Sequence, residues 1–136
     1  MVCIYCGHST SVTNSRLQKR LNQVWRRRQC SQCHNTFTTH EIVEFGTSIM
    51  VRRNAHELTP FIRDNLFISI YEACKHRPSA LSNANALTQT VMGLLREHIH
   101  EGIVERDAIT AVVTTALERF DATAGAVYKA YHPSTK

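Results

Sequence analysis

Hydrophobic residues recur at helical spacing through the last two thirds of the chain. The first such segment, residues 65–76, follows Pro60, which discourages helix at the position before it. Asp64 can cap or charge the start of this segment. One face carries apolar side chains three or four positions apart, namely Leu66, Phe67, Ile70 and Cys74. The pattern predicts a first amphipathic helix over 65–76.

Three further helices are expected from the same pattern. The turn-rich stretch RPSALSN (77–83) predicts a break, after which Asn83 or Asn85 opens a long helix that ends at Gly102. Asp107 begins a third helix and Asp121 a fourth, which Pro133 stops. The apolar faces carry Leu87, Val91, Leu94, Leu95 and Ile99, then Ile109, Val112, Val113 and Leu117, and last Val127, Tyr128 and Tyr131. The last three or four residues are expected to be loose.

The chain before residue 65 has a different pattern. SIMVRR (48–53) and HELTPF (56–61) flank Asn54 and Ala55 and predict a β-hairpin. Before Gly46, short apolar pieces lie among Cys, Arg, Ser, Thr and Gln without helical periodicity. We therefore expect an α+β chain of two domains. A small β module covers 1–46, and a mainly helical domain covers 47–136, with a short hairpin and about four helices.

Basic residues are concentrated in the first domain. Residues 1–46 hold six basic side chains and two acidic ones, whereas residues 47–136 hold ten and nine. An anionic partner is therefore expected at the first domain. No apolar run approaches the roughly 18 residues of a transmembrane helix, and the N-terminus lacks the pattern of a signal peptide. We expect a cytoplasmic protein without membrane contact.

Four of the five cysteines form two pairs, Cys3-x-x-Cys6 and Cys30-x-x-Cys33, with 23 residues between the pairs. This arrangement is typical of a tetrahedral Zn²⁺ site made of four thiolates. Disulfides between the same cysteines are the alternative, less common in a chain of intracellular character. Gly7, and Asn35 after the second pair, suit a left-handed backbone.

Three other residues could compete for the metal. His8 and His34 follow the two pairs, but each pair already supplies two sulfurs, so both are interpreted as bystanders. Cys74 is interpreted as a core residue of the first helix. A module this small cannot bury enough surface by itself, so metal binding should supply much of its folding energy.

A block of arginines, Arg26, Arg27 and Arg28, leads directly into the second cysteine pair. These cations could balance the charge of roughly −2 on a four-thiolate zinc site. They could instead contact phosphate, and the further cations Arg16, Lys19 and Arg20 favour this reading. In a strand, Arg26 and Arg28 would share one side and Arg27 would point to the other. Trp25 could pack in the sheet or stack on a base.

Taken together, CIYCGH, VTNSRL, VWRRRQCSQC and FTTHEIVE closely resemble the zinc ribbon of the NrdR family, bacterial repressors of ribonucleotide reductase genes. The resemblance implies double-stranded DNA as partner and Arg16, Arg26, Arg27 and Arg28 as DNA contacts. Where the family usually has D-S-R, this chain has Asn14-Ser15-Arg16.

Residues 47–132 resemble the second module of that family, the ATP cone, which implies ATP or dATP as allosteric effector. The resemblance rests on a hairpin, on P-F before the first helix, on A-C-K-H-R-P at its end, and on Y-K-A-Y-H in the last helix. The usual hairpin glycine is absent, and Asn65 stands where the family often has lysine. Arg52, Arg53 and Arg63 are the candidate triphosphate contacts. Alternatively, Arg52 and Arg53 are solvated strand charges that pair with Glu57.

The resulting hypothesis is a zinc-dependent, nucleotide-controlled DNA-binding repressor that is not an enzyme. The sequence has no nucleophile–base pair, paired acids or Walker loop that would indicate catalysis. One small ribbon contacts little DNA, so we expect a homo-oligomer on paired half-sites. Two alternatives remain: an accessory protein that binds nucleic acid or protein and has a degenerate cone, and a regulatory partner of ribonucleotide reductase itself.

Overall fold

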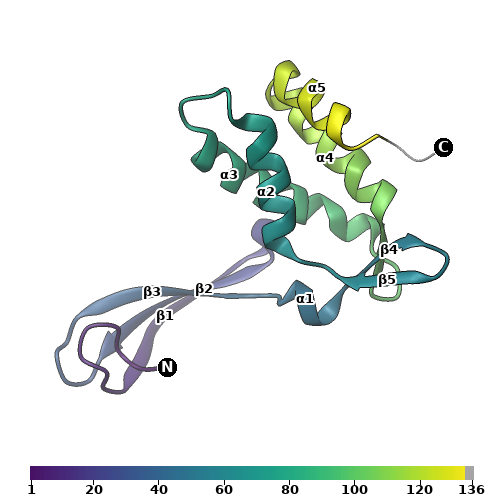
Figure 1. Ribbon diagram of the computed structural model, residues 1–136. Coiled ribbons are helices and arrows are strands. Elements are labelled where there is room, and N and C mark those ends of the chain that lie inside the picture. Colours follow the sequence, from purple (N-terminus) through teal and green to yellow (C-terminus); the bar gives the residue numbers. More distant parts are fainter. Residues whose placement is uncertain (134–136) are drawn as a thin grey trace. The chain divides into compact units, whose positions relative to one another are not determined.

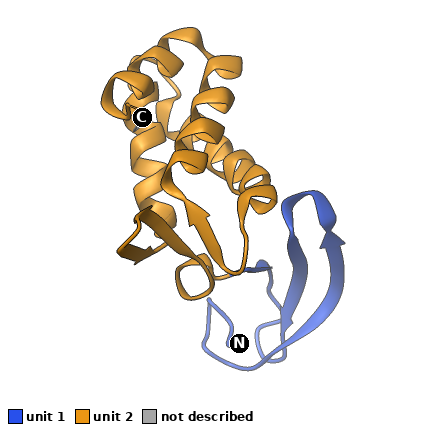
Figure 2. Cartoon of the chain, turned by 90° about the vertical axis from the view of Figure 1, so that its right-hand side faces the viewer, with its two compact units in different colours: residues 1–43 blue, residues 44–136 orange. Residues whose placement is uncertain are grey.

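The computed structural model describes residues 1–133, and the chain forms two compact units (Figures 1 and 2). Unit 1 comprises residues 1–43, and unit 2 begins at Glu44. Each unit has its own cluster of buried side chains. The expectation of a loose C-terminus concerns 134–136, which lie outside the described residues.

Unit 1 is a three-stranded antiparallel sheet in the order β1-β2-β3. Its elements are β1 (Thr10–Gln18), the 3₁₀ turn η1 (Lys19–Leu21), β2 (Gln23–Cys30) and β3 (Thr36–Ile42). Strand β1 contains a bulge, because Val12 pairs with Arg28 whereas Asn14 pairs with Arg27. Thr13 is the extra residue, and its hydroxyl donates to the carbonyl of Arg27 at 3.2 Å.

Unit 2 combines a small mixed sheet with a helical bundle. Its elements are α1 (Phe45–Ser48), β4 (Met50–Asn54), β5 (Glu57–Pro60), α2 (Arg63–Cys74), α3 (Ala80–Leu95), the 3₁₀ turn η2 (Arg96–His98), β6 (Ile103–Glu105), α4 (Arg106–Phe120) and α5 (Ala122–Tyr131). The predicted hairpin is confirmed as β4–β5, and β6 pairs in parallel with β4 on its other side. The α+β prediction is therefore confirmed.

Two of the four helix predictions are confirmed almost to the residue, and a third helix begins within two residues of its expected start. Asp121 is the N-cap of α5, with its carboxylate accepting from the N–H of Ala124 at 3.0 Å. Helix α4 begins at Arg106, next to the predicted Asp107. Helix α2 begins at Arg63, with Asp64 in its first turn and Ile62 as an N-cap that provides no side-chain acceptor.

The predicted limits of the long helix are wrong at both ends. Helix α3 begins at Ala80 and not at Asn83 or Asn85, because Ala80 and Ala84 are buried in the core and extend the packed face toward the N-terminus. It ends at Leu95, and Ile99 lies in extended backbone outside it. The chain must become extended here to form β6. A strand of three residues is too short to show the alternation of apolar and polar positions that would predict it from the sequence. Helix α1 was also not predicted.

The core of unit 2 lies between the helices and one side of the small sheet. Its fully buried side chains include Ile70 from α2, Val91 and Leu95 from α3, and Val113 and Leu117 from α4. These are mainly the apolar positions that the helical spacing indicated. None of the helices that the structure describes combines the length and apolarity needed to span a lipid bilayer.

Asp121 joins two ends of the bundle. Besides capping α5, its carboxylate accepts from Arg77 at 2.6 Å and lies 3.3 Å from His76, both in the short loop between α2 and α3. The N–H of Ala124 and the guanidinium of Arg77 hold the pKa of Asp121 well below its usual range. This carboxylate stabilises the fold at neutral pH and loses that effect as the pH falls below the ordinary range of an aspartate.

Two helical glycines are expected to respond oppositely to alanine. Gly93→Ala adds a methyl group in open space within α3, so the free energy of unfolding should rise by about 0.5–1 kcal/mol. In Gly125→Ala the new carbon would lie 2.6 Å from Cγ and 3.1 Å from Cα of Glu118. Overpacking costs about 1–3 kcal/mol and outweighs the helix propensity gained, so stability should fall. Urea unfolding followed by far-ultraviolet circular dichroism tests both variants, and equal effects would contradict the close α4–α5 contact.

Candidate metal centre and nucleic-acid interface

The four paired cysteines lie at one end of the unit 1 sheet. Cys30 is the last residue of β2, and Cys33 lies in the turn before β3. Two left-handed residues close the turns after the pairs, Gly7 with φ of 75° and His34 with φ of 57°. The second of these corrects the expectation for Asn35, because the residue that follows the pair directly must make the turn. Asn35 instead donates its side-chain N–H to Cys33 Sγ at 3.6 Å.

The sulfur positions fit a tetrahedral metal site. All four Sγ atoms lie within 4.8 Å of one another. Cys3 and Cys33 are 3.7 Å apart, and Cys6 and Cys30 are 3.4 Å apart. A zinc–sulfur bond of about 2.3 Å gives a tetrahedron with an edge of about 3.8 Å, whereas a disulfide bond is about 2.05 Å long. The cysteines are free thiols in this structure, and the centre fits Zn²⁺.

Backbone N–H groups point at the sulfurs, as a thiolate site requires. Cys3 Sγ accepts from Tyr5, and Cys30 Sγ accepts from Cys33 and Gln32. The N–H of Cys33, followed by that of Gln32, lowers the pKa of Cys30 to about 6. A backbone N–H from His8 favours the Cys6 thiolate, but desolvation and the other three sulfurs outweigh it and raise the pKa of Cys6 to about 12. A divalent cation bound between the sulfurs would hold them in the thiolate form.

The residues interpreted as bystanders lie outside this centre. Among the described residues, the metal-ligating cluster contains only the four paired cysteines. The His8 ring contacts the carbonyl of Cys6 at 3.0 Å through Nδ1. Cys74 is fully buried in the core of unit 2, where burial raises the pKa of its thiol.

The strand register divides the arginines between the two sides of the sheet. Arg27 is paired with Asn14 on β1 and Thr38 on β3, and Trp25 is paired with Arg16 and His40. Residues directly opposite on neighbouring strands point to the same side. One side, called here the Arg27 face, therefore carries Asn14, Arg16, Trp25, Arg27, Thr38 and His40. The guanidinium of Arg16 lies over the Trp25 ring at 6.0 Å, which agrees with this assignment.

The opposite side, called here the Arg26 face, carries Ser15, Arg26, Arg28, Thr39 and Glu41. Arg26 donates to Glu41 at 2.8 Å, and Arg28 donates to Thr39 at 3.3 Å. The prediction that Arg26 and Arg28 share a side while Arg27 points away is confirmed. Glu41 is the acidic residue of unit 1, so the Arg27 face has cations and no acid.

The alternative role of the arginines, charge balance at the cysteines, gains no support from direct contacts. Within the described residues, hydrogen bonds to the four sulfurs come from backbone N–H groups, from Asn35 and from other cysteines. Arg27 donates instead to the hydroxyl of Thr36 at 2.9 Å, which holds its side chain over the sheet. Strand alternation predicts that Thr38 and His40 share a side, but their place opposite Arg27 and Trp25 follows only from the register between β2 and β3. The bulge at Thr13 likewise hides the side taken by Asn14 and Arg16.

In unit 2, each candidate triphosphate contact has a polar partner. Arg52 on β4 pairs with Glu105 on β6 at 3.0 Å, and Arg53 lies 3.7 Å from Glu57. The predicted Glu57 pairing thus holds for Arg53 but not for Arg52. Arg63 donates to Asn85 at 3.2 Å. These side chains are about half exposed, so their pairs contribute about 0–1 kcal/mol and exchange readily for another anion.

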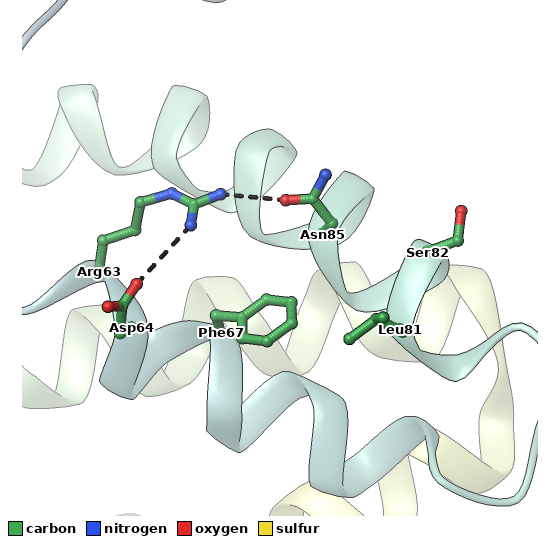
Figure 3. A pocket seen from close by; sticks show the side chains of 6 residues that line it. All are labelled: Arg63, Asp64, Phe67, Leu81, Ser82 and Asn85. Carbon is green, nitrogen blue, oxygen red and sulfur yellow. Dashed lines mark hydrogen bonds and ion pairs between the residues drawn. The ribbon is translucent and has the colours of Figure 1, made fainter.

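Arg63 also lines an open hollow of about 470 Å³ between α2 and α3. Figure 3 shows its guanidinium reaching across from α2 to the Asn85 amide on α3, with the Phe67 ring and Leu81 further along the groove. Asp64 and Ser82 complete the lining, which Arg52 and Arg53 do not join. The hollow therefore brings together one of the three predicted arginines with an aromatic ring.

A four-cysteine ribbon with a basic sheet face, followed by a small helical unit, defines a zinc-ribbon protein of the α+β class. Residues 1–41 match the family model described as "Transcriptional repressor NrdR-like, N-terminal domain".

Similarity to curated relatives extends over most of the chain. A protein of Syntrophotalea carbinolica, named transcriptional repressor NrdR, is 35% identical over 122 residues, which cover 89% of this chain and 76% of the relative. Proteins of the same name from Heliobacterium modesticaldum and Geobacillus sp. are each 34% identical. They cover 79% and 89% of this chain and 70% and 78% of their own lengths. The chain belongs to the NrdR family, as the resemblance of its motifs predicted.

Removal of one sulfur should release zinc and unfold unit 1 alone. Cys30→Ser should lower the zinc content from about one equivalent to near zero, because three sulfurs hold the ion much less tightly. Resonances of unit 1 should collapse toward unfolded shifts in a ¹⁵N spectrum while those of unit 2 persist. Acidification should also release zinc, since protons compete for the thiolates. Cys74→Ala should keep its zinc, and a metal-free purified protein with a folded unit 1 would contradict the site.

Proposed function

We propose that this chain is a zinc-dependent DNA-binding transcriptional repressor of ribonucleotide reductase genes, controlled by ATP or dATP. The observation that carries the proposal is the acid-free Arg27 face, built on a sheet that ends in a four-cysteine centre. Relatives that match most of the chain are named transcriptional repressors. The protein would act in the cytoplasm, without catalysis of its own.

The Arg27 face suits duplex DNA in size and charge. Strands about 4.8 Å apart give three strands a width of about 10 Å, close to the roughly 12 Å of the major groove. Arg16 and Arg27 would meet phosphate or base edges from this face. Arg26 and Arg28, on the opposite face, would contribute mainly through their longer-range field, and Arg26 is partly neutralised by Glu41. Four arginines on two faces cannot all touch one duplex surface.

A single ribbon of this size would bind a short stretch of duplex with modest specificity. Two ribbons on paired half-sites would multiply the affinity, so the active form is proposed to be a homo-oligomer assembled through unit 2. A nucleotide bound to unit 2 would act on DNA binding if it favoured one assembly over another.

The proposed nucleotide contacts are Arg52, Arg53 and Arg63. Their present partners are exposed acids and an amide, which a triphosphate could replace with stronger charge-assisted hydrogen bonds. Arg63 at the start of α2 adds the favourable dipole of a helix N-terminus.

The two arginines at 26 and 27 provide a matched test of the DNA face. Arg27→Ala should weaken binding to duplex DNA by about ten-fold or more and reduce the slope of log affinity against log salt by about 1. Arg26→Ala removes the same charge from the other face and should have a much smaller effect. Fluorescence anisotropy with the zinc-loaded chain at several salt concentrations measures both quantities.

If Arg26→Ala weakened DNA binding more than Arg27→Ala, the result would indicate that DNA contacts the Arg26 face. Equal binding of wild type and of both variants would instead favour an accessory ribbon that binds another partner. Direct action on ribonucleotide reductase is a further alternative, which an inhibition assay with the purified reductase and no DNA would detect.

Isothermal titration calorimetry tests the nucleotide proposal. ATP or dATP should bind the wild-type chain, and Arg52→Ala and Arg53→Ala should each weaken binding by about ten-fold or more, because each removes charged hydrogen bonds to phosphate. Arg96→Ala, which removes an equal charge from the turn after α3, should leave the affinity unchanged. Absence of heat with both nucleotides would support a cone that no longer binds its ligand.

A further inference from the structure

Asn14 lies on the Arg27 face, on the edge strand β1 beside the central strand β2. It lies on β1 directly opposite Arg27, so the two side chains leave the sheet on the same side as nearest cross-strand neighbours. The bulge at Thr13 produces this placement. Val12 and Asn14 would share a side in a regular strand, but the extra residue puts Val12 opposite Arg28 and Asn14 opposite Arg27.

The Asn14 amide is available to a ligand. The side chain is exposed, and within the described part of the chain it has no hydrogen-bond partner. Its neighbour Arg27 is oriented by Thr36 through one nitrogen, which leaves its remaining N–H groups for a partner. Asparagine is uncommon in strands, and the Asn14 side chain is exposed, so neither strand propensity nor packing explains an asparagine at this position.

We propose that Asn14 is a specificity-determining residue that reads an adenine in the major groove, next to the base pair or phosphate contacted by Arg27. This inference rests on the proposed function, because it assumes that duplex DNA lies on the Arg27 face. An asparagine amide offers one donor and one acceptor, which match N7 and the N6 amino group of adenine. No other base presents this pair of groups in the major groove.

An amide at this position also keeps Arg27 available. An aspartate of the same shape would place a carboxylate directly opposite the Arg27 guanidinium, where the two would form an ion pair. That carboxylate would accept from cytosine but could not donate to adenine N7. The neutral amide therefore determines both which base is preferred and how much of the Arg27 charge reaches DNA.

The test compares base preference, and not affinity alone, in four zinc-loaded full-length proteins. A duplex site is first selected from a random library with the wild type and the nucleotide that supports binding. Affinities are then measured for every single base-pair replacement within that site. Wild type should disfavour replacement of one particular A·T pair by about ten-fold or more. Asn14→Ala should lose that discrimination and keep it at other positions, and Asn14→Asp should bind more weakly and disfavour adenine there.

Ser15→Ala is the matched control, because Ser15 is the next residue on β1 and lies on the Arg26 face. It should reproduce the wild-type preferences. Zinc content and thermal unfolding of each variant establish that the ribbon is intact. If Asn14→Ala keeps the full preference profile, or loses affinity equally at every position, Asn14 reads no base and the inference is wrong while DNA binding stands. If the wild type selects no duplex, the result contradicts the proposed DNA binding, and therefore also the inference that depends on it.

Discussion

The convergence of four sulfur atoms on one point is the constraint on which unit 1 depends. Its buried cluster consists of Cys3, Cys30 and Phe37, with Cys33 packed against it, so two of the three buried residues of the cluster are candidate metal ligands. A unit of 43 residues with so little buried apolar surface is near the size at which chains need a metal or disulfides to fold. A metal ion bound at the site would therefore supply much of the free energy that holds the three strands in register, and the register in turn places the arginines on one face or the other. Metal binding and the placement of the arginines on two faces therefore depend on the same fold of unit 1.

Unit 2 is stabilised in a different way. Among the described residues, sixteen buried side chains from the four long helices, β6 and the adjoining segments form one core, and Gly125 lets α4 and α5 approach closely. Asp121 then fixes the loop between α2 and α3 to the start of α5. The arginines proposed for nucleotide binding lie outside this core, on a small sheet and at the start of α2, held only by exposed partners. A ligand could rearrange them without disturbing the packing beneath.

The sequence predicted those elements whose cause is local. The apolar spacing of α2, α4 and α5, the capping aspartate at 121 and the two-residue spacing within each cysteine pair are local signals, and each was confirmed in outline. The features that were missed depend on distant contacts. Strand β6 exists because β4 provides an edge some fifty residues earlier in the chain, and its formation ends α3 at Leu95. The sides taken by the three arginines of β2 were predictable from alternation, but the side taken by Arg16 on β1 depends on the register between strands, which the sequence does not show.

The bulge at Thr13 has an evolutionary consequence. Because alternate residues of a strand point to opposite sides, a single insertion or deletion between the first cysteine pair and Arg16 would invert the orientation of the remaining β1 side chains, unless the bulge were gained or lost at the same time. Changes of two residues would preserve the orientation. Insertions and deletions in this strand of related ribbons should therefore involve two residues, or be accompanied by loss of the bulge.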